Sequence, residues 1–327
     1  MERRPTAVAR FGLLGKPKPL RPFASWFLIS PDEALFRCRG FPETPAAARL
    51  ERAAGAFVAG HNIAALAADT DEILDALAAR PSVERGFFAE GAAMGSAIRT
   101  ICRPWRDTLA PLLAALRTHY VHLSHVGVGW AMARMPFARR ALARRLDPML
   151  APLATDGLGF HDGYFRSTAV AGGWRRLRGT TGPVYDQGVG RSLWFSCGAD
   201  PARIASVVAS LEAARHDDLW AGVGLASVYA GGAGPSGIDQ LKAAAGPSGR
   251  WLMQGAAFAV GAYARTGIVP REAEEAALRI SGVDPETLVA LVDRAFADAR
   301  HHVGAQPAPY QCWRKHVADA LARDGRA

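Results

Sequence analysis

The sequence has few of the features that place a protein outside the cytoplasm or in a membrane. Only four of its 327 residues are cysteine, and no two of them form a CxxC pair. This scarcity argues against a zinc knuckle or a thioredoxin motif and predicts buried free thiols. No apolar run approaches the roughly 18 residues that cross a bilayer, and residues 1–20 lack the apolar segment of a secretory signal. We therefore expect a cytoplasmic protein without a membrane partner.

Lysine is also scarce. It provides only four of the 39 basic residues, in a chain with a net charge of +9. A basic surface attracts anions. The bias toward arginine, beside many alanines, is however typical of a GC-rich coding sequence, and this weakens any inference from arginine count to nucleic-acid binding. Nucleic acid is therefore the less favoured partner.

Segments that alternate like a half-buried strand are almost absent, and residues 182–185 are the one candidate. Asp200 and Asp284 each precede a proline and an amphipathic run, a pattern typical of a capped helix start. Such helical patterns follow one another from about residue 46 onward. The sequence therefore predicts an all-α fold.

Proline divides the chain unevenly. Seven prolines interrupt residues 1–46, and each removes a backbone donor and fixes φ. We expect an irregular, proline-rich extended arm there, with one short helix at residues 32–38. Residues 47–327 then form a single helical domain, which could divide into halves at 47–150 and 151–327.

A short glycine motif recurs along the domain. In most copies one residue separates a glycine from another small residue, and a polar residue often comes just before. Successive copies lie 25 to 36 residues apart, a period typical of helix-hairpin repeats. Glycine in a helix lets a neighbouring helix approach closely, so we expect a repeat-like array; the alternative is chance in a chain rich in alanine and glycine. The copies are at Gly60, Gly91, Gly127, Gly163, Gly188, Gly222 and Gly255.

Two of these copies carry side chains suited to acid–base chemistry or to anion binding. His161, Asp162 and Tyr164 lie within four positions. Neighbouring helical residues do not face each other, so we do not expect a His161–Asp162 dyad, and Asp162 could instead cap a helix. Asp186 with Gln187 and Arg191 could hold a carbonyl or carboxylate. They could equally form a hydrogen-bond network that fixes helix register.

No motif assigns a cofactor, so the cofactor stays unknown. The glycine motif at Gly188 follows no convincing strand and so does not fit a dinucleotide site, and a Walker motif is absent. His216 with Asp217 and Asp218, and His301 and His302 with His316, match no known ligand spacing, and we expect no metal site.

Two sets of side chains each allow two interpretations. Several arginines between Arg134 and Arg145 form a basic stripe, which is either a solvated face or a docking surface for an acidic partner. The tryptophans near the glycine motifs either pack in the core or line a long apolar groove. They are Trp130, Trp174, Trp194, Trp220, Trp251 and Trp313.

Five blocks of the sequence resemble successive blocks of the UnbL-type proteins, a bacterial domain of unknown function encoded in enediyne biosynthesis cassettes. The resemblance runs from about residue 20 to 320, in the same order. The blocks are RGFFAEGAAMGSAI (85–98), FHDGYF (160–165), YDQGVGRSLWFSCGADP (185–201), LWAGVGLASVYAGG (219–232) and LMQGAAFAVGAYARTG (252–267).

The resemblance implies an accessory or tailoring role in making a polyunsaturated polyketide, with a polyketide synthase or acyl carrier protein as partner. It carries no assigned catalytic residues. We expect a hydrophobic polyunsaturated ligand; the alternative function is a basic helical module that docks nucleic acid or an acidic protein. The residues predicted to face one pocket are Asp162, Tyr164, Asp186, Gln187 and Arg191 for catalysis, and His161, Trp194, Tyr229 and Gln254 for binding.

Overall fold

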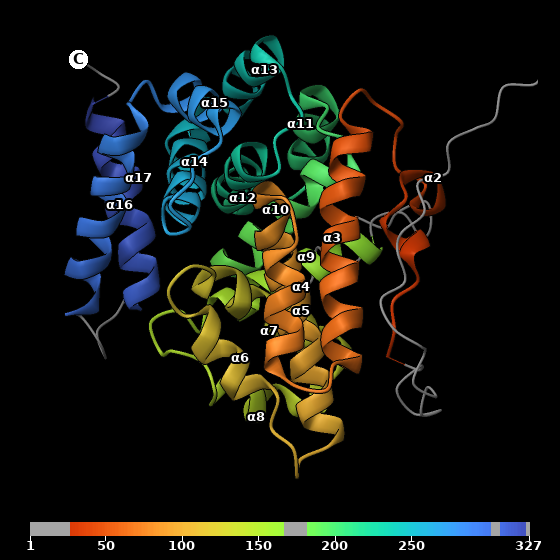
Figure 1. Cartoon of the computed structure of the whole chain (residues 1–327). Coiled ribbons are helices and arrows are strands. Elements are labelled where there is room, and N and C mark those ends of the chain that lie inside the picture. The colour runs from red at the N-terminus through yellow and green to blue at the C-terminus, as the bar shows by residue number, and fades with distance from the viewer. Residues whose placement is uncertain (1–26, 167–181, 302–307, 325–327) are drawn as a thin grey trace, which may run out of the picture.

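The computed structural model describes residues 27–166, 182–301 and 308–324, and these residues form an all-α fold without a strand (Figure 1). The all-α prediction is confirmed. The α-helices are α2 (Phe36–Arg39), α3 (Ala47–Leu66), α4 (Thr70–Ala78), α5 (Ser82–Cys102), α6 (Leu109–Leu116), α7 (Val121–Arg134), α8 (Arg139–Ala143), α9 (Leu153–Arg166), α10 (Pro183–Ser196), α11 (Pro201–Ala209), α12 (His216–Tyr229), α13 (Pro235–Ala245), α14 (Gly249–Ala264), α15 (Arg271–Ser281), α16 (Pro285–Arg300) and α17 (Pro309–Asp324). Short 3-10 turns are η1 (Pro31–Ala34), η2 (Pro136–Ala138), η4 (Ala213–Arg215) and η5 (Gly246–Ser248).

Seven helices, α3, α5, α7, α9, α10, α12 and α14, pack in chain order, each against the next. The helices α16 and α17 pack on α14, and they lie at one side of the molecule in Figure 1. The structure contains no described helix long and apolar enough to cross a bilayer.

Glycines sit where consecutive helices touch. A Cβ added to Gly222 of α12 would lie 1.9 Å from the carbonyl oxygen of Gln187 in α10. A Cβ added to Gly224, two residues on, would lie 2.1 Å from the carbonyl oxygen of Leu252 in α14. One glycine of the pair therefore faces the preceding helix and the other faces the following one. Any larger residue would push these backbones apart.

All seven glycines of the recurring motif face a neighbouring helix. An added Cβ would meet a backbone carbonyl oxygen at six of them, and the Ser192 hydroxyl at Gly163. The close approach expected from the sequence is therefore present, while the helix-hairpin repeat itself stays a prediction.

Helix starts agree with the sequence at two places and differ at a third. The carboxylates of Asp200 and Asp284 accept hydrogen bonds from backbone N–H groups of α11 and α16. The prediction of a strand at residues 182–185 is wrong, because Pro183 is the first residue of α10. Proline is favoured there, since the first N–H of a helix has no partner within it.

The described part of the predicted arm is not detached from the helices. Residues 27–46 contain η1 and α2 rather than one helix over 32–38. The side chains of Ile29, Phe36 and Phe41 are buried in the main core. This packing places η1 beside α3, where it contributes to the cavity described below.

The four cysteines are free thiols, as expected, but they are not uniformly buried. Cys197 is buried, Cys102 and Cys312 are half-buried, and Cys38 is exposed. The prediction of buried thiols is wrong for Cys38, which lies on the solvent side of the short helix α2.

Candidate functional site

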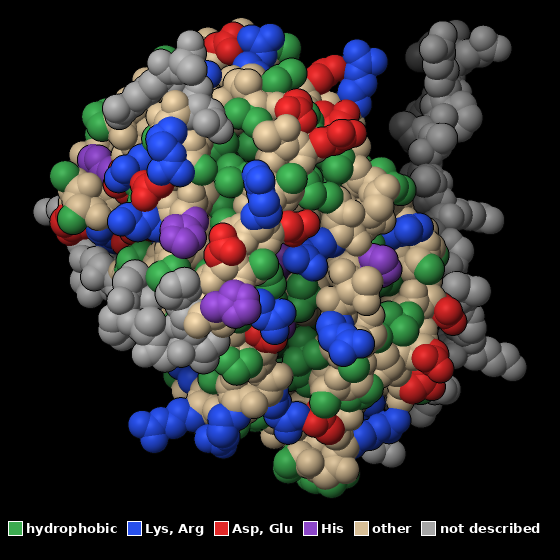
Figure 2. Space-filling view, turned by 90° about the vertical axis from the view of Figure 1, so that its left-hand side faces the viewer, with side chains coloured by type: hydrophobic (Ala, Val, Ile, Leu, Met, Phe, Trp, Pro, Cys, Tyr) green, Lys and Arg blue, Asp and Glu red, His purple; other side chains and the backbone are tan. Residues whose placement is uncertain are grey.

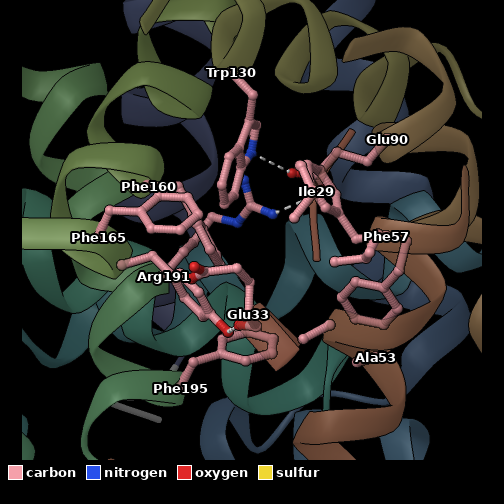
Figure 3. Close-up of a pocket in the computed structure, with 14 residues that line it drawn as sticks. Ile29, Glu33, Ala53, Phe57, Glu90, Trp130, Phe160, Phe165, Arg191 and Phe195 are labelled. Atoms are coloured by element: carbon pink, nitrogen blue, oxygen red, sulfur yellow. Dashed lines mark hydrogen bonds and ion pairs between the residues drawn. The ribbon is translucent and has the colours of Figure 1, made fainter. Parts of the chain in front are cut away.

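A cavity lies between η1 and the helices α3, α5, α7, α9 and α10 (Figure 3). Its wall is mostly aromatic and aliphatic, and its acidic and basic side chains are those of Glu33, Glu90 and Arg191. The lining residues are Ile29, Glu33, Ala53, Ala54, Phe57, Val58, Phe87, Glu90, Trp130, Phe160, Tyr164, Phe165, Arg191 and Phe195.

Aromatic rings pack against one another along this wall. The Trp130 ring lies 4.5 Å from Phe57 and 5.1 Å from Phe160, between ring centroids. Phe160 in turn contacts Phe195 at 5.5 Å in an edge-to-face arrangement. Such flat, apolar walls fit conjugated or aliphatic chains, which gain free energy by leaving water.

Charged side chains meet at the inner end of the cavity. Arg191 Nη1 lies 2.5 Å from Asp156 Oδ1, and Arg191 Nη2 lies 3.4 Å from Glu90 Oε2. The other oxygen of Glu90 accepts a hydrogen bond of 2.9 Å from Trp130 Nε1, as Figure 3 shows. These side chains come from α5, α7, α9 and α10, so the cluster links four of the seven packed helices.

Burial and neighbouring charges shift the pKa values of this cluster. Burial raises the pKa of Glu90; the positive charge of Arg191 opposes that shift, and Asp156 adds to it. Burial alone would lower the pKa of Arg191, but the negative charges of Asp156 and Glu90 raise it overall. Arg191 therefore stays charged, whereas Glu90 ionises less readily than a carboxyl group in water.

Buried amides adjoin the cluster. Gln187 Nε2 donates to Asp156 Oδ2 at 2.7 Å and lies 3.3 Å from the Tyr310 hydroxyl. Gln187 Oε1 and both amide atoms of Gln254 have no hydrogen-bond partner among the described residues. A buried amide without a partner is costly, so these atoms are the natural places for bound water or for a polar group of a ligand.

Arg191 also borders a second cavity of ≈ 580 Å³ on the other side of the cluster. The rings of Phe258 and Trp313 stack there at 4.2 Å, and His122 lies 5.8 Å from Trp313. Burial lowers the pKa of His122 to about 3, so its ring is neutral near pH 7. The Arg191 cluster therefore separates two aromatic cavities.

The residues predicted to share one pocket are distributed over several places. Tyr164 and Arg191 line the first cavity, Arg191 and Tyr229 line the second, and Gln187 adjoins the cluster between them. Asp186 lines neither cavity, because Arg215 holds it through Nε at 3.1 Å and Nη2 at 2.5 Å. Its catalytic role stays a prediction.

The residues predicted to bind the ligand are also spread over several places. Trp194 is fully buried in the core and donates to the carbonyl oxygen of Gly231 at 2.9 Å. Gln254 is fully buried and lines neither cavity. His161 lies behind the aromatic wall, 5.6 Å from Trp130 between ring centroids.

The structure brings the side chains of His161 and Asp162 together, although the sequence predicts that they do not face each other. His161 Nδ1 lies 3.3 Å from Asp162 Oδ1, and the Tyr185 hydroxyl donates to Asp162 Oδ2 at 2.9 Å. Asp162 lies well inside α9, so it is not a cap.

The tryptophans form no continuous wall. Trp130 lines the first cavity and Trp313 the second, whereas Trp194 and Trp220 are core residues and Trp251 is half-buried. Trp174 lies outside the described residues. Phenylalanine and tyrosine therefore provide most of the aromatic surface expected from tryptophan.

The histidine groups are apart from the cavities. Asp217 accepts a hydrogen bond from Ser248 at 2.7 Å, and Asp218 pairs with Arg314 at 2.8 Å. His301 and His316 are exposed, and His302 lies outside the described residues. Within the described ranges no three His, Cys, Asp or Glu side chains form a group that could hold a metal ion.

Sequence reasoning missed Glu90 and Asp156. Both directly precede a glycine of a buried helix, as Gln187 does. The signal that could have found them is a charged residue in an otherwise apolar helix, next to a glycine that touches the neighbouring backbone. Such a residue is buried near a helix contact and needs a partner of opposite charge.

Comparison with known proteins gives a family but no function. No curated protein and no solved structure was found to match the chain. Residues 24–321 match the family "Protein of unknown function (DUF1702)", which covers most of the sequence. The chain therefore belongs to the DUF1702 family.

Proposed function

We propose that the chain binds an elongated, apolar, polyunsaturated molecule in the first cavity. The observation that carries this proposal is the aromatic wall of Phe57, Trp130 and Phe160, which ends at the buried Glu90–Arg191 pair. An apolar wall with a few fixed polar groups is typical of small-molecule sites.

The resemblance of the sequence to the UnbL-type proteins supports a finer proposal. The ligand is an intermediate of a polyunsaturated polyketide pathway, and the chain is an accessory or tailoring protein that holds or reshapes it. The aromatic lining supports this ligand class because conjugated chains and aromatic rings both present flat apolar faces.

A fluorescence titration with cis-parinaric acid, a conjugated tetraene, tests the binding proposal. We expect saturable binding, with energy transfer from Trp130 to the tetraene. Ala54 lines the mouth of the cavity, so Ala54→Phe fills space there and should reduce affinity by at least about tenfold, a loss of ~1.4 kcal/mol.

A matched substitution on the same helix controls for nonspecific effects. Ala48 is exposed on α3 and lines neither cavity, so Ala48→Phe should leave the affinity unchanged. Absence of binding to the unaltered protein, or equal affinity in both variants, would contradict the proposal.

A second candidate function, docking of an acidic protein such as an acyl carrier protein, is supported by the surface around α8. Arg139, Arg140 and Arg144 are exposed there, and Phe137 is 81% exposed beside them. Figure 2 shows Lys and Arg side chains along the lower edge of one face of the molecule. Exposed arginines beside an exposed aromatic ring suit an acidic partner.

Salt-dependent retention tests this docking. We expect the protein to bind an immobilised acyl carrier protein at low salt and to elute as salt screens the charges. Replacing Arg139 and Arg140 by glutamate should abolish retention. Stronger retention on duplex DNA than on the carrier protein would favour the nucleic-acid alternative instead.

A further inference from the structure

The inner end of the first cavity is poor in positive charge. Two carboxyl groups, Glu90 and Asp156, already face the one guanidinium of Arg191, and all three side chains are buried. An anionic group placed beside them would be a third acid against one cation. Such repulsion is strong away from water, so this end of the cavity accepts an uncharged group.

The mouth of the cavity has the opposite balance. Among the lining residues only Glu33, Ala54 and Phe165 are half-buried, and they mark the side open to solvent. The guanidinium carbons of Arg39 and Arg134 lie 4.7 and 5.7 Å from the centroid of the Phe165 ring.

Only one of these two arginines forms a salt bridge with a described residue. Arg39 Nη1 pairs with Glu33 Oε2 at 2.9 Å, whereas exposed Arg134 forms no such bridge and interacts with the charge of Glu33 only at longer range. Glu51, whose carboxylate accepts a hydrogen bond of 2.7 Å from the backbone N–H of Phe36, does not line the cavity. With two arginines beside the single lining acid Glu33, the mouth can receive an anion beside Arg134.

From this asymmetry we infer that the cavity binds an apolar chain with a single anionic end, which enters with its uncharged end first. That end lies beside Glu90, and the anionic end stays at the mouth beside Arg39 and Arg134. The inference rests on the function proposed above and adds the orientation and the head group of the ligand.

Two sources could supply such a chain. One is a free long-chain carboxylic acid, and the other is an acyl chain thioesterified to the phosphopantetheine arm of a carrier protein, whose phosphate is the anionic group. The shared chemistry is an anion at one end of an apolar chain.

Competition between two matched acids tests the orientation. Dodecanoic and dodecanedioic acids differ only in whether the second end is charged, and each can compete with cis-parinaric acid. We expect the diacid to compete at least about tenfold more weakly, since it must place one carboxylate beside Glu90. In Glu90→Gln this difference should shrink.

The outcomes separate the two proposals. Equal competition by the two acids overturns the orientation while leaving the binding proposal standing. If cis-parinaric acid itself does not bind, the proposed function fails, and this inference fails with it.

Charge reversal at the mouth tests the head group. Arg134→Glu should weaken binding of dodecanoic acid by about tenfold, the size of one close charge interaction near a surface. Binding of methyl dodecanoate, which has no charge, should not change. Exposed Arg294 of α16 is the control, and Arg294→Glu should affect neither ligand. An equal loss for acid and ester in Arg134→Glu would overturn the role of Arg134.

A last pair of ligands distinguishes the two sources. S-dodecanoyl phosphopantetheine carries the arm and the phosphate of the carrier-bound source, and it should bind more tightly than dodecanoic acid if that source is the ligand, because the arm and the phosphate then add contacts beyond those of the chain. Tighter binding of the free acid would overturn the carrier-bound source and assign the free acid.

Discussion

At the scale of single residues, Arg191 holds the centre of the molecule together. It is one buried cation between two buried carboxyl groups, and its partners lie on two other helices, α5 and α9. Removing one member of a buried charge cluster leaves the others unpaired and costs more than the pair itself contributes. The sequence indicated Arg191 but not its partners.

The first prediction concerns that cluster. Arg191→Met keeps much of the side-chain volume but leaves Asp156 and Glu90 without their cation, so it should lower the free energy of unfolding by about 3–5 kcal/mol. The exposed Arg294 is the control, and Arg294→Met should change it by less than about 0.5 kcal/mol. Urea unfolding followed by circular dichroism measures both; similar small losses would show that the cluster contributes little.

The second prediction follows from the raised pKa of Glu90. A carboxyl whose pKa is higher in the folded chain than its ordinary value of 4.5 costs stability as pH rises above 4.5, since the folded state then has to ionise a buried acid. Glu90→Gln cannot ionise, so its stability relative to the unaltered protein should increase from pH 5 upward. Thermal melts of both proteins between about pH 5 and 8 give this difference. A difference that stays constant with pH, or falls, would contradict the assignment.

At the scale of helices, burial explains which helices can be predicted from the sequence. The capped starts of α11 and α16 were predicted because Asp200 and Asp284 act locally. The helix α10 was harder, since every residue from Val184 to Phe195 is buried. A helix buried on all sides has no polar face and therefore no amphipathic period, and its first residues were mistaken for a strand.

Two glycine substitutions should have opposite effects. In Gly222→Ala the new Cβ would meet the carbonyl oxygen of Gln187, so the helices α10 and α12 must separate, and stability should fall by about 1–3 kcal/mol. Gly55 lies inside α3 with nothing within 4 Å of an added Cβ. Gly55→Ala should therefore raise stability by up to about 1 kcal/mol through helix propensity. Chemical denaturation of the two variants is the test, and a loss in both would argue against the packing role of Gly222.

At the scale of the whole molecule, the sequence predicts the helices and their close contacts better than it predicts which side chains meet in the site. The all-α fold and the close glycine contacts follow from local patterns. The meeting of Glu90, Asp156 and Arg191 does not, because it depends on how three helices far apart in the sequence turn their faces toward one centre. The same is true of the segment that contains η1, since Ile29 just before η1 and Glu33 within it line the cavity.

The most direct test of the account is a crystal structure of the protein grown with cis-parinaric acid. We predict continuous electron density for the tetraene along the wall formed by Trp130 and Phe160, with its uncharged end toward Glu90 and its carboxylate near Arg134. An empty cavity in a crystal that holds the ligand elsewhere, or density with the carboxylate beside Glu90, would contradict the account.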